Sequence, residues 1–220
     1  MATELVMVDF GRAYPVFPLR DGVLLPQAVM PLHVFEPRYR RMVSDVLDSH
    51  GMIAMALLRG EVPMDEYLHG RPPLREFMCL GQIREYERMA DGRYVLLLQG
   101  LCRVRVEREL THSPYRRVRL RPAEQSVPGE EQLAAYRRRL DELLRQHVAH
   151  DGAAKPILAT EDYENVSTPV VVDLAIAAVC QETAQQYRLL SQPDVCRRAE
   201  WVIHRMEVLT GQHPDTNARN

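Results

Sequence analysis

The apolar residues of this chain change their spacing near Pro122, and this change restricts the fold more than any other feature of the sequence. Before it, short apolar segments are separated by proline and glycine, which is typical of short strands and extended loops. After it, apolar residues recur three and four positions apart, which is the period of an α-helix. A β-rich part followed by a helical part predicts an α+β protein.

We expect the β-rich part to cover residues 1–122, with one helix inside it. Pro37 stands at a first helical position, apolar residues follow at helical spacing, and Gly51 suits the position just after a helix end. Segments 53–58, 77–89, 93–109 and 115–121 have the composition of strands, and Asp91-Gly92 indicates a hairpin. Several strands with a single early helix predict a small, strongly curved sheet or barrel.

Segment 59–73, between two of these strands, is polar and contains prolines. Loops of that length are uncommon inside a compact domain unless they have a role. We therefore expect a loop that is either mobile or covers another part of the protein.

The strand expected at residues 94–107 is apolar on both faces where it begins. Val95, Leu97, Leu101 and Arg103 share one face by alternation, and the even-numbered residues share the other. Both faces are therefore covered at the start of the strand. Packing inside the protein is the favoured explanation, and a partner's apolar segment is the alternative. Gly100 predicts a bulge or a barrel corner that another backbone approaches closely.

Residues 123–211 form the helical part, and residues 212–220 form a polar tail. Segment 129–150 carries an apolar stripe, and a second helix begins at Thr168-Pro169 and is apolar on nearly every side. A last helix opens within residues 191–194. Because a helix without a polar face needs neighbours on all sides, we expect a helical bundle.

Lys155 is the only lysine of the chain, and this restricts the chemistry. A phosphate-binding loop needs a serine or threonine directly after its lysine, whereas Pro156 follows Lys155. A Ser–Lys hydrolase dyad would have to use the same lysine, in a segment with no apolar wall to lower its pKa. The sequence therefore predicts a protein without catalytic residues, and it indicates no cofactor.

Charge and cysteine spacing exclude other classes. The formal net charge is −2, from 28 Lys and Arg against 30 Asp and Glu, so no overall field attracts nucleic acid or an anionic membrane. Cys79, Cys102, Cys180 and Cys196 lie far apart without histidines at ligand spacing, which predicts free thiols and no metal site. The N-terminus lacks the basic start of a signal peptide, and no segment reaches the ~18 apolar residues of a membrane span. We expect a cytoplasmic protein.

Segment 30–43, Met-Pro-Leu-His-Val-Phe-Glu-Pro-Arg-Tyr-Arg-Arg-Met-Val, resembles the opening of the N-terminal, substrate-binding domain of Lon proteases. Its most specific part is formed by Pro31, Leu32, Phe35, Glu36, Arg38 and Tyr39. Later segments follow the order found in that family: Gly81-Gln-Ile83, Asp91-Gly92-Arg-Tyr94, Gly100 with Arg103, and Pro114-Tyr115. The resemblance extends over residues 14–209.

This resemblance implies a PUA-like pseudo-barrel followed by a helical bundle. In Lon proteases, which form peptidase family S16, such a domain binds polypeptide substrates and helps to assemble the ring, while separate domains carry the ATPase and peptidase sites. Because the chain ends at Asn220, we expect a stand-alone protein without those sites. We expect the signature residues, with Gly92 and Gly100, to be structural. The two prolines set the chain direction, Phe35 anchors the following helix, and Glu36 and Arg38 pair or cap backbone groups.

The leading hypothesis is a non-catalytic module that binds extended or partly unfolded polypeptide, through apolar surface on or beside the sheet. We expect Val95, Leu97, Leu101 and Arg103 to contact the peptide, with strand addition at an open sheet edge as one mode. The alternative is an adaptor or assembly module for one folded partner, which would bind through the bundle or through segment 59–73. The sequence specifies neither the client nor the oligomeric state.

Overall fold

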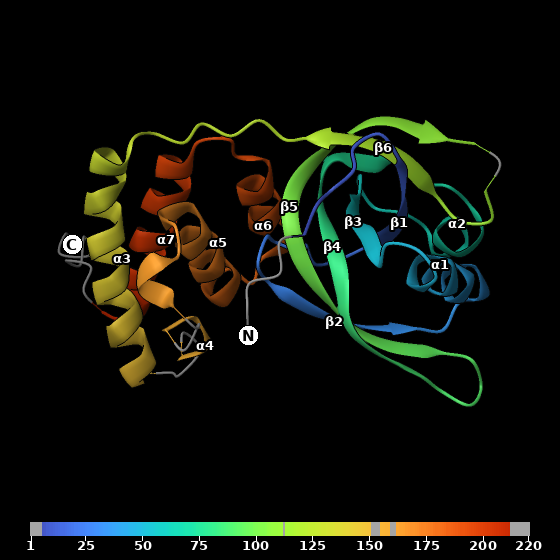
Figure 1. The fold of residues 1–220 in the computed structure, drawn as a ribbon, viewed down its shortest axis with the longest axis horizontal. Coiled ribbons are helices and arrows are strands. Elements are labelled where there is room, and N and C mark those ends of the chain that lie inside the picture. Colours follow the sequence, from blue (N-terminus) through green and yellow to red (C-terminus); the bar gives the residue numbers. More distant parts are fainter. Residues whose placement is uncertain (1–5, 112, 151–154, 159–161, 212–220) are drawn as a thin grey trace, which may run out of the picture. The chain divides into compact units, whose positions relative to one another are not determined.

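The structure is a computed structural model that describes residues 6–111, 113–150, 155–158 and 162–211 (Figure 1). The chain divides into two compact units. Among the described residues, the β unit holds residues 6–124 together with Glu182–Ser191, and the helical unit holds Gln125–Gln181 and residues 192–211. The tail expected at residues 212–220 lies outside the described residues.

The β unit is built on six strands in the order β2-β5-β4-β3-β1-β6. β1 and β3 run parallel, and every other pair is antiparallel. Because β5 also pairs with β6, the sheet closes on itself and forms the predicted barrel. The strands are β1 (Ala13–Leu19), β2 (Val29–Val34), β3 (Met52–Leu58), β4 (Leu74–Arg88), β5 (Tyr94–Leu110) and β6 (Arg117–Pro122).

β5 makes closure possible because it changes partners along its length. Residues 94–99 pair with β2, and residues 104–110 pair with β6, while β4 lies along the other edge. Register shifts occur in both long pairings, and such bulges bend a strand enough to turn a barrel corner. The side chains inside the barrel form one apolar cluster: Tyr14, Val16, Met52, Ala54, Ala56, Met78, Leu80, Val104, Val118 and Leu120.

The early helix is confirmed as α1 (Pro37–Leu47), with proline in its first turn. Its buried face consists of Tyr39, Met42, Val43 and Val46, at the spacing that the sequence shows. Gly51 adopts φ +65° and donates its N–H to the Val46 carbonyl at 2.7 Å, which ends the helix. The hairpin is also confirmed, with Gly92 at φ +80° between β4 and β5.

The expectation that residues 59–73 form a loop was incomplete, because a short helix, α2 (Met64–His69), lies within them. None of its residues is buried. Met64, Tyr67 and Leu68 lie at helical spacing, but six residues between prolines are too few to show a periodic apolar pattern. Three arginine side chains of the β unit donate hydrogen bonds to backbone carbonyls of this segment. Arg20 donates to the Val62 carbonyl, Arg38 to the Tyr67 carbonyl, and Arg116 to the Pro72 carbonyl.

The helical unit contains α3 (Glu130–His150), α4 (Lys155–Leu158), a 3-10 helix (Tyr163–Asn165), α5 (Thr168–Val179) and α7 (Val195–Leu209). Helices α3, α5 and α7 pack against one another, and α5 buries seven of its residues, as its nearly all-apolar sequence predicts. Asp194 caps α7 by accepting the N–H groups of Cys196 and Arg197 at 2.8 and 3.4 Å.

Helix α6 (Thr183–Ser191) departs from the expected division of the chain, because it joins the β unit although it lies between two bundle helices in sequence. Tyr187 contacts the barrel twice: its hydroxyl accepts the Phe77 N–H at 3.2 Å, and the Arg75 guanidinium lies over its ring, 4.6 Å from the centroid. Thr183 and Gln186 accept the N–H groups of Gly22 and Val23. These contacts come from residues far away in sequence, so a local pattern does not reveal them.

Candidate functional site

One edge of β2 pairs with no other strand of the described chain. Among the described residues β2 pairs with β5 alone, so its other edge carries no strand. Pro31 lies opposite Leu97, and proline has no N–H with which to join a hydrogen-bonded pair. Val29, Pro31 and His33 therefore direct their backbone polar groups away from β5. Ala28, an even-numbered residue, points its carbonyl the opposite way, toward β5, because that carbonyl accepts the Gly100 N–H at 2.8 Å.

The same residues present their side chains to solvent. β2 alternates between exposed odd and more buried even positions, with Val29 54% exposed and Leu32 and Val34 buried. Phe35, directly after the strand, is 58% exposed. The sheet therefore offers an apolar surface beside an open backbone edge, and we call it the β2–β5 face: Val29, Pro31, His33, Phe35, Val95 and Leu97.

Glutamates border this face on β4. His33, Val95 and Glu87 form one cross-strand row, and Pro31, Leu97 and Glu85 form the next. Glu85 and Glu87 are both exposed. The apolar surface is thus two strands wide, and the two glutamates form its border on β4. A surface of this width suits one extended peptide segment better than a broad folded partner.

The four residues expected to contact peptide do not lie together. Val95 is 43% exposed, and Leu97 beside it is partly exposed, so both belong to the β2–β5 face. Leu101 packs partly buried against the barrel core. Arg103 is only 4% exposed and donates its Nε–H to the Leu190 carbonyl of α6 at 3.2 Å. The alternation that grouped them does not hold, because the β4–β5 register shifts between Gly100 and Cys102 and the Arg103 side chain contacts α6.

Most signature residues make internal contacts. Glu36 and Arg38 form an ion pair at 2.9 Å, and Glu36 makes no side-chain cap to α1. Tyr39 is buried and stacks on Phe17 with 4.6 Å between ring centroids. Phe35 differs from the expectation that it anchors α1, because its ring is exposed and lies 6.0 Å from the His33 ring.

The two signature glycines stand where a side chain would collide with a neighbour. A Cβ on Gly100 would lie 2.2 Å from the Leu25 carbonyl oxygen, and the register shift beside Gly100 is the bulge expected there. A Cβ on Gly92 would lie 2.1 Å from an Arg40 nitrogen, in a turn that already has positive φ. Both positions set the path of β5.

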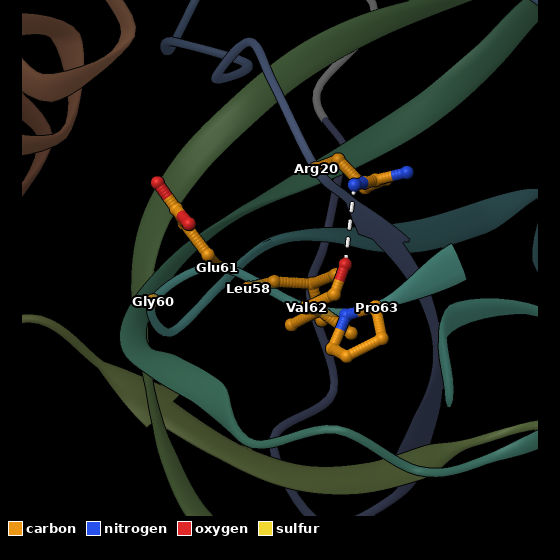
Figure 2. Close-up of a pocket in the computed structure, with 6 residues that line it drawn as sticks. All are labelled: Arg20, Leu58, Gly60, Glu61, Val62 and Pro63. Carbon is orange, nitrogen blue, oxygen red and sulfur yellow. Dashed lines mark hydrogen bonds between the residues drawn. The ribbon is translucent and has the colours of Figure 1, made fainter. Parts of the chain in front are cut away.

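A hollow of about 590 Å³ lies at the ends of the parallel strands β1 and β3. Figure 2 shows Arg20 turned toward the Val62 carbonyl, to which it donates at 3.1 Å, and the Glu61 carboxylate pointing away from Arg20. Gly60, Leu58 and Pro63 supply the rest of the wall. This lining contains one cation and one anion but no nucleophile, so it offers a polar recess and no acid–base pair.

The described residues show no other sign of reactive chemistry. No group of three or more His, Cys, Asp or Glu among them could hold a metal ion. The four cysteines are free, and burial raises the pKa of the Cys102 thiol to about 11, which suppresses its thiolate. Nor does any described helix combine the length and apolarity that crossing a membrane requires.

The model of the ATP-dependent protease La (Lon) substrate-binding domain matches residues 13–208. The chain belongs to this family. Its match includes the signature segment and all six strands, as well as helices of both units. The resemblance seen in the sequence is therefore confirmed.

Solved structures share the fold. The N-terminal domain of a Mycobacterium avium complex Lon protease is 18% identical, with a TM-score of 0.63, and the match covers 89% of this chain and 98% of that one. A Lon N-terminal domain protein from Xanthomonas campestris is 24% identical, with a TM-score of 0.58 and coverage of 88% and 98%. The mixed α+β fold with a barrel and a C-terminal helical part is thus that of Lon N-terminal domains.

Similar curated proteins are much longer than this chain. Lon protease 2 of Myxococcus xanthus is 26% identical over 197 residues, which are 89% of this chain and 23% of that protein. Lon protease 2 of Sorangium cellulosum is 29% identical over 135 residues, which are 60% of this chain and 16% of that protein. The chain spans less than a quarter of the length of these two relatives, and the family model assigns that region to substrate binding.

Proposed function

We propose that this protein binds extended or partly unfolded polypeptide at the β2–β5 face and performs no covalent chemistry. The observation that carries the proposal is an unpaired strand edge beside exposed apolar side chains. Val29 and His33 can donate and accept backbone hydrogen bonds with an added strand, Pro31 can accept one through its carbonyl, and Val95, Leu97 and Phe35 can receive apolar side chains. The family description as the substrate-binding domain of a protease agrees, because the substrates of proteases are polypeptides.

Two observations support a binding role without catalysis. The sequence has a single lysine followed by proline, which leaves no phosphate-binding loop of the usual kind. The family match is to the substrate-binding domain alone. Free thiols are characteristic of a reducing compartment, and they support the cytoplasm as the place of action.

The proposal predicts that Val95→Asp weakens binding of an unfolded chain. Val95 is 43% exposed, so a carboxylate there is tolerated in the free protein but is desolvated beneath a bound strand. Loss of a buried valine contact and burial of a charge together amount to a reduction in affinity of at least about tenfold. Fluorescence anisotropy of labelled casein, titrated with the purified protein, measures the change.

Val127→Asp is the matched control, since Val127 is 54% exposed and lies in the helical unit. Wild type and Val127→Asp should bind casein with the same saturable curve. The proposal fails if wild type shows no saturable binding, or if Val95→Asp binds as tightly as Val127→Asp. In the first case, an adaptor for one folded partner becomes the better explanation.

A further inference from the structure

A second hollow, of about 300 Å³, lies between the start of α1, the end of α2 and the segment before β6. Three arginines line it, Arg38, Arg71 and Arg116, and Tyr39 and Tyr115 contribute aromatic surface. It is separate from the β2–β5 face, since none of these residues belongs to that face. Three guanidinium groups around so small a volume raise the question of what balances their charge.

Two of the three arginines are neutralised by carboxylates. Arg38 pairs with Glu36 at 2.9 Å. Arg116 is buried, and it donates two hydrogen bonds to the Glu109 carboxylate, from Nε to Oε1 at 2.8 Å and from Nη2 to Oε2 at 2.6 Å. This side-on geometry occupies both oxygens of Glu109 with one guanidinium.

Arg71 forms a long ion pair with Glu109, and it shares that glutamate with Arg116. Its Nη1 reaches Glu109 Oε1 only at 3.9 Å, which is beyond hydrogen-bond distance, and that oxygen already accepts from Arg116. Its Nη2 donates to the neutral Ser113 carbonyl at 2.9 Å, and its side chain is 45% exposed. Two glutamates therefore face three guanidinium groups of the hollow, and a third carboxylate, that of Asp45, accepts the Tyr115 hydroxyl at 2.9 Å and pairs with Arg41, outside the lining, at 3.9 Å.

We propose that this hollow binds a carboxylate group through Arg71. A carboxylate carries a single negative charge, equal to the excess of the three guanidinium groups over the two glutamates, whereas inorganic phosphate near neutral pH carries between one and two. A guanidinium fork also matches the two oxygens of a carboxylate. Leu68 and Pro114 add apolar wall next to the aromatic rings, which suits a short apolar group attached to the carboxylate.

The site is held in shape before any ligand arrives. Arg38 donates Nη2 to the Tyr67 carbonyl at 2.9 Å and lies over the Tyr39 ring at 4.6 Å. Arg116 also donates to the Pro72 carbonyl, so arginines fix the chain on both sides of Arg71. Burial raises the pKa of Tyr39, so this phenol stays protonated at neutral pH and can donate a hydrogen bond. A fixed frame lowers the entropic cost of binding.

Such a carboxylate has two possible sources, the C-terminus of a polypeptide or a free small acid. Three probes separate them: acetyl-Ala-Ala-Leu with a free carboxylate, the same peptide as its amide, and N-acetyl-leucine. Binding is followed in ¹H–¹⁵N spectra through the arginine Nε–H signals. The free peptide acid should bind at least about tenfold more tightly than its amide, because the amide lacks the charge-assisted hydrogen bonds.

Arg71→Gln should weaken binding of the peptide acid at least about tenfold, and Arg71→Lys should weaken it less, because lysine keeps the charge and loses the fork. Arg138→Gln is the control, since Arg138 is an exposed arginine of α3. Equal affinity for acid and amide, wild-type affinity of Arg71→Gln, or tighter binding of inorganic phosphate than of N-acetyl-leucine would each overturn the proposal. N-acetyl-leucine binding as tightly as the peptide acid would support the site and identify a free acid as its ligand, and weaker binding would identify a chain terminus.

This inference does not rest on the proposed function. Val95→Asp should leave the affinity for acetyl-Ala-Ala-Leu unchanged, because Val95 lies on the separate β2–β5 face. Loss of casein binding in that variant with retained peptide-acid binding would support both sites. Failure at one site therefore says nothing against the other.

Discussion

Arg198 is fully buried in α7 and forms an ion pair with Asp173 of α5, with Nε and Oδ1 3.4 Å apart. Arg198 Nη1 also donates to the Gln192 carbonyl at 2.7 Å, and Nη2 donates to Gln125 Oε1 at 3.2 Å. The arginine thus combines an ion pair between two bundle helices with hydrogen bonds to the segments around α7. We predict that removing one charge of this pair costs far more than removing both.

The expected magnitudes follow from burial. Asp173→Leu leaves the arginine charge without its carboxylate, and Arg198→Met leaves a carboxylate whose side chain is 6% exposed, so each should lower the free energy of unfolding by about 3–5 kcal/mol. The double variant Asp173→Leu/Arg198→Met buries no charge. It still loses hydrogen bonds to Gln192 and Gln125, at about 1 kcal/mol each, so it should lose only about 1–3 kcal/mol.

The assay can be local because Trp201, the only tryptophan of the chain, lies in α7 one turn after Arg198. Urea unfolding followed by Trp201 fluorescence reports on the helical unit of each variant. The reasoning is refuted if either single variant loses less than about 1 kcal/mol, or if the loss in the double variant equals the sum of the single losses.

Two other stability predictions concern the β unit. Gly100→Ala should cost about 3 kcal/mol or prevent folding, because its Cβ has no space, whereas Gly129→Ala, with nothing within 4 Å, should stay within about 0.5 kcal/mol of wild type in urea unfolding; equal stabilities would contradict the close approach. Burial and nearby arginines lower the pKa of His50, whose Nδ1 accepts the Met52 N–H at 3.0 Å. Because the folded state binds this proton less readily than the unfolded state does, His50 should contribute stability above its unfolded pKa of about 6.5 that is lost as the pH falls below it. His50→Asn should flatten the pH dependence of urea unfolding between about pH 7.5 and 5 relative to wild type; an identical slope in His50→Asn would exclude this role.

Elements with a strong local signal could be predicted from the sequence. Pro37, the spaced apolar residues after it and Gly51 define α1, and the Asp91-Gly92 turn defines the β4–β5 hairpin. The apolar run of α5 marks a buried helix. In each case, the residues that specify the structure are adjacent or within one helical turn, so a pattern in the sequence records them.

Parts without such a signal could not be predicted. α2 has no buried residue, and α6 has contacts to residues more than a hundred positions away, such as Tyr187 to Phe77. The same limit applies to the candidate site. Alternation along β5 grouped Arg103 with Val95, but a register shift and the contact of Arg103 with α6 separate the buried guanidinium from the exposed valine.

The β2–β5 face has a partial signal in the sequence. Val29, Pro31, His33 and Phe35 alternate with more buried residues, and a proline within a strand indicates an edge. Which edge stays open depends on how β5 divides its length between β2 and β6, and no local pattern contains that information.

Sequence by itself determined the switch from β-rich to helical structure, the early helix, the hairpin and the family. Each of these depends on the spacing of apolar residues or on turn residues that are close together in the sequence. Tertiary structure alone decided that α6 joins the barrel, that Arg103 is buried, and that Arg71 and Arg116 share one carboxylate, that of Glu109. These outcomes depend on residues that folding brings together from distant parts of the chain. The burial and the ion pairs of a side chain are set by those spatial neighbours, and not by the residues next to it in sequence.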